Sequence, residues 1–226
     1  MNVLVLGSTG VVGDALIRES LKNPRVVTVV AVTRRPLKHT HKQLVTAHLS
    51  DFADFSPLED ILARTNVVLC ALGISWYQAS GEAHYRQITH DYVMACARVA
   101  AVANPEMRFC FVSGQGASAT SSQAWARIKV ETERDLESTF GSRLSVFRPG
   151  YIFPMAGREQ PYWGDTVMKP LMLARGALSR WITDSNEVAR AMLHAALGGA
   201  VPSPASNRDM IAAADAYRRG PVTATT

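Results

Sequence analysis

The chain contains 226 residues, of which 47% are hydrophobic and 19% charged, and its formal net charge is +5. This composition supplies enough apolar surface for a sizeable core, so one soluble globular domain is expected over residues 1–226. The basic residues are dispersed except for Arg34, Arg35, Lys38 and Lys42, and helix-turn-helix, RNA-recognition and zinc-finger patterns are absent. A phosphate-sized anion therefore fits the charge better than nucleic acid does.

The first apolar run, residues 3–6, is short, and no basic segment precedes it. We therefore expect neither a signal peptide nor a membrane span, and the expected location is the cytoplasm. Cys70, Cys96 and Cys110 lie inside apolar stretches and form no Cys-x-x-Cys pair. They are expected to be reduced, buried thiols, and no metal site is predicted.

Short apolar runs alternate with helix-length amphipathic segments, a pattern typical of a parallel sheet covered by helices on both faces. The expected strands are residues 3–6, 26–33, 44–49, 67–72, 109–113 and 144–148. The expected helices are residues 11–21, 57–64, 84–103 and 122–139. The predicted fold class is therefore α/β with a doubly wound parallel sheet.

A glycine-rich turn follows the first strand and opens the first helix, with the sequence Gly7, Ser8, Thr9, Gly10, Val11, Val12, Gly13. The first two glycines let the backbone turn tightly and approach a pyrophosphate, and Gly13 lets the helix pack closely on the sheet. The helix N-terminus then offers N–H donors to the anion. The turn predicts a Rossmann-type dinucleotide site, and the alternative is a structural turn that binds no ligand.

The second strand ends at Thr33, and Arg34 and Arg35 follow it directly. An acidic residue here would bind the ribose 2′-hydroxyl of NAD, but the chain has two guanidinium groups instead. Because guanidinium is a planar donor suited to phosphate, the pair predicts NADP, with NADPH preferred over NADH. The alternative is a solvated basic loop, to which His39 and His41 would also belong.

Two further strand ends lie at the carboxyl edge of the sheet, where open α/β sheets bind ligands. Asp51 and Phe52 follow the third strand, and Asp51 is predicted to accept a hydrogen bond from the adenine amino group. Ala71, Leu72 and Gly73 end the fourth strand, where small residues would let the ribose and pyrophosphate lie against the backbone.

Taken in order, these motifs resemble an atypical short-chain dehydrogenase/reductase, most similar to the Tat-interacting-protein-like and NAD-dependent epimerase/dehydratase-related branch. The resemblance extends over nearly the whole chain. Beyond the motifs above, it rests on residues 85–93, 112–117, 129–133, 148–151, 186–192 and 207–210. It implies a Rossmann-type NAD(P)-binding fold with a small C-terminal extension on the substrate side.

Catalytic members of this family use a serine, a tyrosine and a lysine, and the resemblance assigns their places to Ser113, Trp125 and Lys129. The lysine lowers the pKa of the phenol and holds the nicotinamide ribose, while the phenol exchanges a proton with a carbonyl or an alcohol. Indole donates a hydrogen bond but does not ionise usefully, so Trp125 is unable to act as that acid.

Three interpretations of Trp125 stay open. It can stack near the nicotinamide and leave a cofactor-binding protein without turnover, or another acid such as Tyr77, Tyr151 or a water can supply the proton. The third is that Trp125 is simply packed on its helix. The charged residues that follow are expected to form a solvated helix face, with Lys129 as the exception; they are Glu131, Glu133, Arg134, Asp135 and Glu137.

The residues after the sixth strand are expected to bend over the nicotinamide end of the cleft. Pro149 fixes φ, Gly150 permits close approach, and both are predicted cofactor contacts together with Tyr151. Residues 151–183 are interpreted as a substrate-side cover, or alternatively as the core of a small C-terminal subdomain. Residues 220–226 have little to bury and are expected to be a frayed tail.

The sequence thus favours an NADP(H)-binding protein with oxidoreductase activity on an unidentified small molecule. The second hypothesis is a catalytically silent protein that senses the dinucleotide and reports it to a protein partner, which the missing tyrosine favours. Neither nucleic acid nor a membrane is an expected partner. A monomer or a homodimer is expected.

Overall fold

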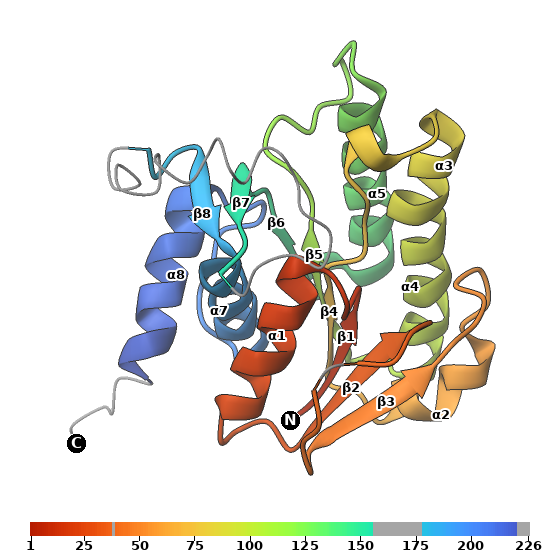
Figure 1. Cartoon of the computed structure of the whole chain (residues 1–226), viewed down its shortest axis with the longest axis vertical. Coiled ribbons are helices and arrows are strands. Elements are labelled where there is room, and N and C mark those ends of the chain that lie inside the picture. The colour runs from red at the N-terminus through yellow and green to blue at the C-terminus, as the bar shows by residue number, and fades with distance from the viewer. Residues whose placement is uncertain (38, 156–177, 221–226) are drawn as a thin grey trace.

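A computed structural model describes residues 1–37, 39–155 and 178–220 (Figure 1). Within these residues, six parallel strands form a sheet in the order β3-β2-β1-β4-β5-β6. The strands are β1 (Asn2–Leu6), β2 (Thr28–Thr33), β3 (Leu44–His48), β4 (Val67–Cys70), β5 (Arg108–Val112) and β6 (Leu144–Phe147). This is the strand order of a Rossmann-type doubly wound sheet, so the predicted fold class is confirmed.

Helices cover both faces of the sheet (Figure 1). Leu4 and Leu6 of β1 pack into one core, and Val3 and Val5 pack into the other, because successive side chains of a strand point to opposite faces. The first core is closed by α2 (Glu59–Ala63), α4 (Tyr92–Ala103) and α5 (Ala124–Phe140), and the second by α1 (Val11–Lys22), α7 (Ser185–Ala196) and α8 (Asn207–Arg219).

The helix expected over residues 84–103 is divided. α3 (Glu82–Arg86) passes into a π-helical turn, η3 (Gln87–Asp91), before α4 begins. A π turn adds a residue to the helix and shifts the face that points inward, which a regular period does not anticipate. The other strands and helices expected before residue 150 begin and end within two residues of their predicted bounds. Short 3-10 turns are η1 (Ser56–Leu58), η2 (Trp76–Gln78) and η4 (Gly141–Arg143).

After β6 the chain leaves the main sheet. β7 (Tyr151–Phe153) pairs in parallel with β8 (Ile182–Asp184), which leads directly into α7. Capping boxes begin both C-terminal helices, with Asp184 at α7 and Ser206 at α8. Of the expected cover and frayed tail, residues 156–177 and 221–226 lie outside the described residues.

The segment before α8 occupies part of the outer edge of β6. Ala205 forms a parallel bridge with Phe147, and its N–H donates to the Val146 carbonyl at 2.8 Å. The Arg148 N–H donates to the Ala205 carbonyl at 2.9 Å. These bonds fix the N-terminus of α8 beside the carboxyl end of β6.

The three cysteines are buried and unpaired, as expected. Burial raises the pKa of Cys70 and of Cys110 to about 12. Because the thiolate is the reactive form, these thiols act as packing groups. In the described part of the chain, no helix is long and apolar enough to cross a membrane.

Candidate functional site

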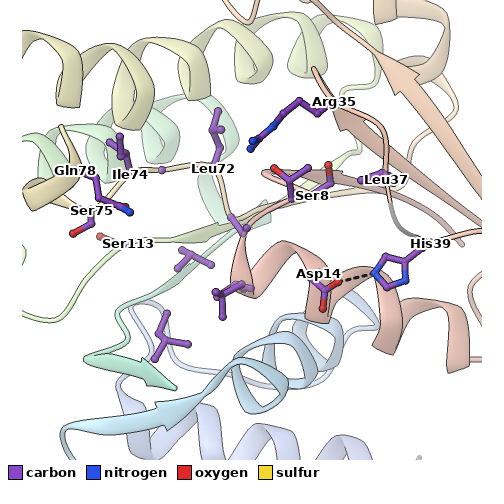
Figure 2. Close-up of a pocket in the computed structure, with 18 of the residues that line it drawn as sticks. Ser8, Asp14, Arg35, Leu37, His39, Leu72, Ile74, Ser75, Gln78 and Ser113 are labelled. Carbon is purple, nitrogen blue, oxygen red and sulfur yellow. Dashed lines mark hydrogen bonds and ion pairs between the residues drawn. The ribbon is translucent and has the colours of Figure 1, made fainter. Parts of the chain in front are cut away.

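A cleft of about 600 Å³ opens at the carboxyl edge of the sheet (Figure 2). The strand order reverses between β1 and β4, and the connections that leave these strands on opposite sides create a crevice there. The predicted site residues that line the cleft are Ser8, Thr9, Gly10, Val11, Val12, Arg35, Ala71, Leu72, Gly73, Ser113 and Lys129. The sequence therefore identified most of the β1, β4 and α5 walls.

The glycine turn holds the β1–α1 connection tightly against the sheet. Gly7 has a φ of +84°, and a Cβ at this residue would lie 2.6 Å from the backbone of Ala71. A Cβ on Gly13 would lie 2.0 Å from the Gly7 carbonyl oxygen. Gly10 is the N-cap of α1, whose first-turn N–H groups have no partner within the helix. The turn thus has the bare backbone and the free donors that a pyrophosphate requires.

Of the two arginines predicted to bind phosphate, one lines the cleft and the other does not. The Arg35 side chain extends into the cleft from the end of β2 (Figure 2). The backbone N–H of Arg35 donates to Thr33 Oγ1 at 3.0 Å. Arg34 does not line the cleft, because its guanidinium stacks on Phe52 with Cζ 5.3 Å from the ring centroid. The cleft is therefore left with one of the two guanidinium groups.

Asp14 and His39, which also line the cleft, form a hydrogen-bonded pair (Figure 2). His39 Nε2 lies 2.6 Å from one oxygen of Asp14, and Arg18 donates to the other at 2.9 Å. Burial alone would raise the pKa of Asp14, but the bonds from Arg18 and His39 outweigh burial and lower this pKa. The assignment of His39 to a solvated loop is therefore wrong, and Asp14 was missed although it directly follows Gly13.

Asp51 and Phe52 lie outside the cleft lining. Asp51 is exposed, and its side chain accepts a hydrogen bond from the Ala53 N–H at 2.8 Å. Phe52 is buried and packs edge-on against Phe55, with ring centroids 5.7 Å apart. Phe52 is thus a core residue that supports Arg34, and a contact of Asp51 with adenine stays a prediction.

Lys129 reaches the cleft from α5 with only 9% of its surface exposed. Its Nζ donates to the Val112 carbonyl at 3.0 Å and lies 4.9 Å from the centroid of the Phe111 ring. Burial lowers its pKa to about 8. An amine with a pKa near neutrality can both hold and release a proton under physiological conditions. Its burial agrees with the prediction that Lys129, unlike the charged residues expected on the solvated face of the same helix, points inward.

Ser113 is bonded to a charged pair behind the cleft. Its Oγ donates a short hydrogen bond to Glu133, and Arg148 Nε donates to the same carboxylate oxygen at 2.9 Å. A second Arg148 nitrogen donates to the other oxygen, and this bond holds the pKa of Arg148 above its usual value. Glu133 is 8% exposed, so its assignment to a solvated face is wrong. It follows Lys129 by one helical turn and therefore shares the inward face.

Trp125 is half-buried at the start of α5 and does not line the cleft. Its ring covers the loop after β5: a Cβ on Gly114 would lie 3.6 Å from Cζ3, and one on Gly116 would lie 3.5 Å from Cη2. This contact favours the interpretation that Trp125 is packed on its helix. Neither tyrosine considered as a replacement acid lines the cleft, and Tyr77 is 82% exposed.

The bend after β6 supports the β5 loop rather than the cleft. The Pro149 carbonyl accepts from the Gln115 N–H at 2.7 Å, and the Gly150 N–H donates to Asn207 Oδ1 at 3.0 Å. Pro149, Gly150 and Tyr151 are absent from the cleft lining that the structure describes, and their contacts with the cofactor stay predictions. Lining residues that the sequence did not indicate are Pro36, Leu37, Ile74, Ser75, Gln78, Val112 and Ile152.

A separate cluster lies on α5 and the π turn, where ligand-type atoms of His90, Glu131 and Asp135 come within 4.8 Å of one another. His90 is hydrogen bonded to Asp91 at 2.7 Å and to Asp135 at 2.9 Å. Both Glu131 oxygens accept from Arg86. Since every group already has a partner, the cluster is an ion-pair network between neighbouring helices.

Comparison with known proteins agrees with this geometry. The model of the NAD dependent epimerase/dehydratase family matches residues 3–137, which include the glycine turn, β1 to β5 and most of α5. The chain belongs to this family. The resemblance found in the sequence is confirmed, and the cleft is that of an NAD(P)-binding family.

Several named relatives cover much of the chain. Protein fmp52, mitochondrial, of Aspergillus clavatus is 27% identical over 232 residues, which cover 97% of this chain and 98% of that protein. Protein HTATIP2 of Rattus norvegicus is 29% identical over 153 residues, which cover 67% of this chain and 62% of that protein.

Solved structures share the fold. The Bordetella bronchiseptica enzyme WbmH in complex with NAD+ has a TM-score of 0.67 at 15% identity, with 90% of this chain and 73% of that chain covered. MoeE5 in complex with UDP-glucuronic acid and NAD has a TM-score of 0.67 at 19% identity, with 96% and 82% covered. At these identities the likeness shows the fold alone.

The expected cytoplasmic location is wrong. Relatives from Aspergillus clavatus, Chaetomium globosum and Coccidioides immitis, each aligned over at least 96% of this chain, are all named as mitochondrial proteins. We expected the cytoplasm because no signal peptide was recognised before the first strand. Such an observation does not identify a compartment.

Proposed function

We propose that the protein binds NADP(H), with the glycine turn at the pyrophosphate and Arg35 at the 2′-phosphate. The observation that carries this proposal is the guanidinium of Arg35, which enters the cleft at the end of β2 (Figure 2). Guanidinium offers paired donors to a phosphate. Asp14, an acid that lines the same cleft, is already bonded to Arg18 and His39, so its charge is partly compensated.

Calorimetric titration with NADPH and NADH at fixed ionic strength tests this specificity. We expect the parent to bind NADPH at least about 10-fold more tightly than NADH, since a charge-assisted pair contributes about 1.5–3 kcal/mol. Arg35→Ala is expected to lose this preference with little change for NADH. Arg34→Ala is the matched control, because that guanidinium packs on Phe52. Equal affinities of the parent for the two dinucleotides would contradict the proposal.

The proposed reaction is hydride exchange between the nicotinamide and a small carbonyl or alcohol. The cofactor supplies the hydride chemistry when bound. Lys129 holds a proton at Nζ in the cleft, and a pKa of about 8 lets it give this proton to an oxygen near neutral pH. Ser113 donates its own hydrogen to Glu133, so its oxygen remains an acceptor that positions the substrate. Lys129 thus serves as the acid that Trp125 is unable to provide.

The second candidate function is a catalytically silent dinucleotide sensor. Trp125 favours it, because its ring packs on the β5 loop and the described cleft lining contains no tyrosine. A screen of carbonyl compounds by NADPH oxidation separates the two functions, with NADPH affinity measured in parallel. Turnover that disappears in Lys129→Met while NADPH still binds supports the oxidoreductase. Binding without turnover in both proteins supports the sensor.

A further inference from the structure

A second cavity, of about 270 Å³, lies beyond the loop that follows β5. Its lining residues are Gln115, Arg180, Ser206, Asn207 and Arg208. Gln115 follows Ser113 by two residues, and Ser113 lines the main cleft. Two neighbouring stretches of this one loop therefore line the two hollows.

Asn207 lines this cavity and carries a donor that is not used within the described structure. The residue is 2% exposed, and its Oδ1 accepts from the Gly150 N–H at 3.0 Å, which fixes the orientation of the amide. Its Nδ2 is buried and has no hydrogen-bond partner among the described residues. A buried amide N–H without a partner costs about 1–3 kcal/mol, so a ligand that accepts from it gains free energy.

The N-terminus of α8 adds further donors at the same place. Asn207 and Arg208 are the first two residues of this 13-residue helix. The capping box uses the N–H groups of Ser206 and Asp209. The N–H groups of Asn207 and Arg208 belong to the helix end that lacks carbonyl partners, and the end of the helix dipole here is positive.

The charge of the cavity is also positive. Arg180 and Arg208 are both exposed residues that line it, and the described residues of its lining include no acid. The Arg180 guanidinium lies 5.4 Å from the centroid of the Trp181 ring, which limits its freedom. Asp209, the acid on the same helical turn, is bonded to Ser206 in the capping box. Two guanidinium groups match the charge of a phosphate better than that of a carboxylate.

We propose that this cavity binds a phosphoryl group of the substrate, held by Arg180, Arg208, Asn207 and the N-terminus of α8, while the reactive carbon lies at Lys129 in the cleft. The substrate class is then a phosphorylated small carbonyl or alcohol. The assignment of the ligand as a substrate rests on the oxidoreductase function proposed above, but the anion site itself does not.

Inorganic phosphate is the probe for this site, titrated calorimetrically into the whole protein after saturation with NADP+, which blocks the pyrophosphate site. We expect a dissociation constant of about 1 mM, as a few charge-assisted bonds would give. Arg180→Ala/Arg208→Ala is expected to weaken phosphate binding at least about 10-fold. Asn207→Asp keeps the acceptor for Gly150 and replaces the donor by a negative charge, so it is expected to act in the same direction.

Arg219→Ala is the matched control, because it removes one positive charge from the opposite end of α8. It should change phosphate affinity less than about 2-fold, and NADPH affinity should be unchanged in every variant. Equal phosphate affinity in the parent and the double variant, or an equal loss in Arg219→Ala, overturns the proposal. Acetate that binds more tightly than phosphate overturns the phosphoryl assignment.

The phosphate site can also be tested if the protein does not bind NADP(H). If the parent does not bind the dinucleotide, the same phosphate titration is run without it. Any phosphate that enters the glycine turn then contributes equally to the parent and the double variant. A difference between them supports the second cavity, and its absence overturns it.

Discussion

The two ends of the cleft are built from different parts of the polypeptide. Around β1 and α1 the site consists of backbone, since Gly7 and Gly13 leave no space for a side chain. Around β5 and β6 it consists of side chains, with Lys129 in the cleft and the carboxylate of Glu133 behind Ser113. We therefore expect a substitution at the backbone end to abolish dinucleotide binding, and one at the side-chain end to alter the proposed chemistry. The two proposed properties can then be tested separately.

The largest effect is expected at the backbone end, with Gly13→Ala. The new Cβ would lie 2.0 Å from the Gly7 carbonyl oxygen, and neither backbone segment can move without opening the turn. We expect a loss of more than about 3 kcal/mol in the free energy of unfolding and no measurable NADPH binding. Urea denaturation and calorimetry measure both. Gly10→Ala, where the Cβ would meet that oxygen at 3.3 Å, should cost less than about 1 kcal/mol.

At the side-chain end, Glu133→Gln leaves Arg148 without its anionic partner and weakens the bond from Ser113. Because the carboxylate is buried, we expect a loss of about 3 kcal/mol in the free energy of unfolding. Glu131→Gln is the control on the same helix, since its pair with Arg86 is much more exposed to solvent and should contribute less than about 1 kcal/mol. Equal losses in urea denaturation would show that Glu133 has no special role.

The buried amine of Lys129 predicts a pH dependence. Its pKa is about 8 in the native state, against 10.5 when solvated, so between these values the unfolded chain binds more protons and stability rises with pH. Below pH 8 the native state carries the full cost of the buried charge. Lys129→Met removes this contribution, so its stability relative to the parent should fall by about 2–3 kcal/mol between pH 7 and 10.5.

Urea denaturation at the two pH values measures this change, and the comparison with the parent cancels the titration of other groups. Lys22→Met is the control, because the Lys22 side chain is 64% exposed. A stability difference between parent and Lys129→Met that does not vary with pH would mean that the amine is solvated in the native protein.

Trp125→Tyr should have the smallest effect on stability, below about 1.5 kcal/mol, because the half-buried ring only covers the β5 loop. It returns a phenol to the place one turn before Lys129. If Lys129 is already the acid, NADPH-dependent reduction should change less than about 5-fold. Activity that appears only in the variant would instead identify the parent as a sensor.

The sequence predicted the fold and the backbone end of the site well, because both depend on local patterns. An apolar strand followed by Gly7 to Gly13 permits few conformations, and the strands are apolar on both faces. It did not predict the π turn at Gln87–Asp91, since a regular helical period does not anticipate a single inserted residue. Lys129 was assigned through the family resemblance and not through a local pattern, and it lines the cleft.

The side-chain end was predicted less well, because its contacts join residues far apart in the chain. Glu133 lies in a run of charged residues that is typical of a solvated helix face. Its burial is explained by its hydrogen bonds with Arg148 and Ser113. Arg34 and Arg35 look equivalent in sequence, yet the aromatic ring of Phe52 takes one of them away from the cleft. Asn207, the first residue of α8, gave no signal in the sequence of its contact with Gly150.

The attachment of Ala205 to β6 has a consequence for self-association. An open sheet presents two edge strands, and the free N–H and C=O groups of an edge invite pairing with another molecule. At β6 part of this edge is taken by Ala205, and at the other end β3 is only five residues long and mostly polar or exposed. The segment that contains Ala205 therefore blocks part of the β6 edge. Its removal would leave the backbone N–H and C=O groups of β6 free to pair with a strand of another molecule.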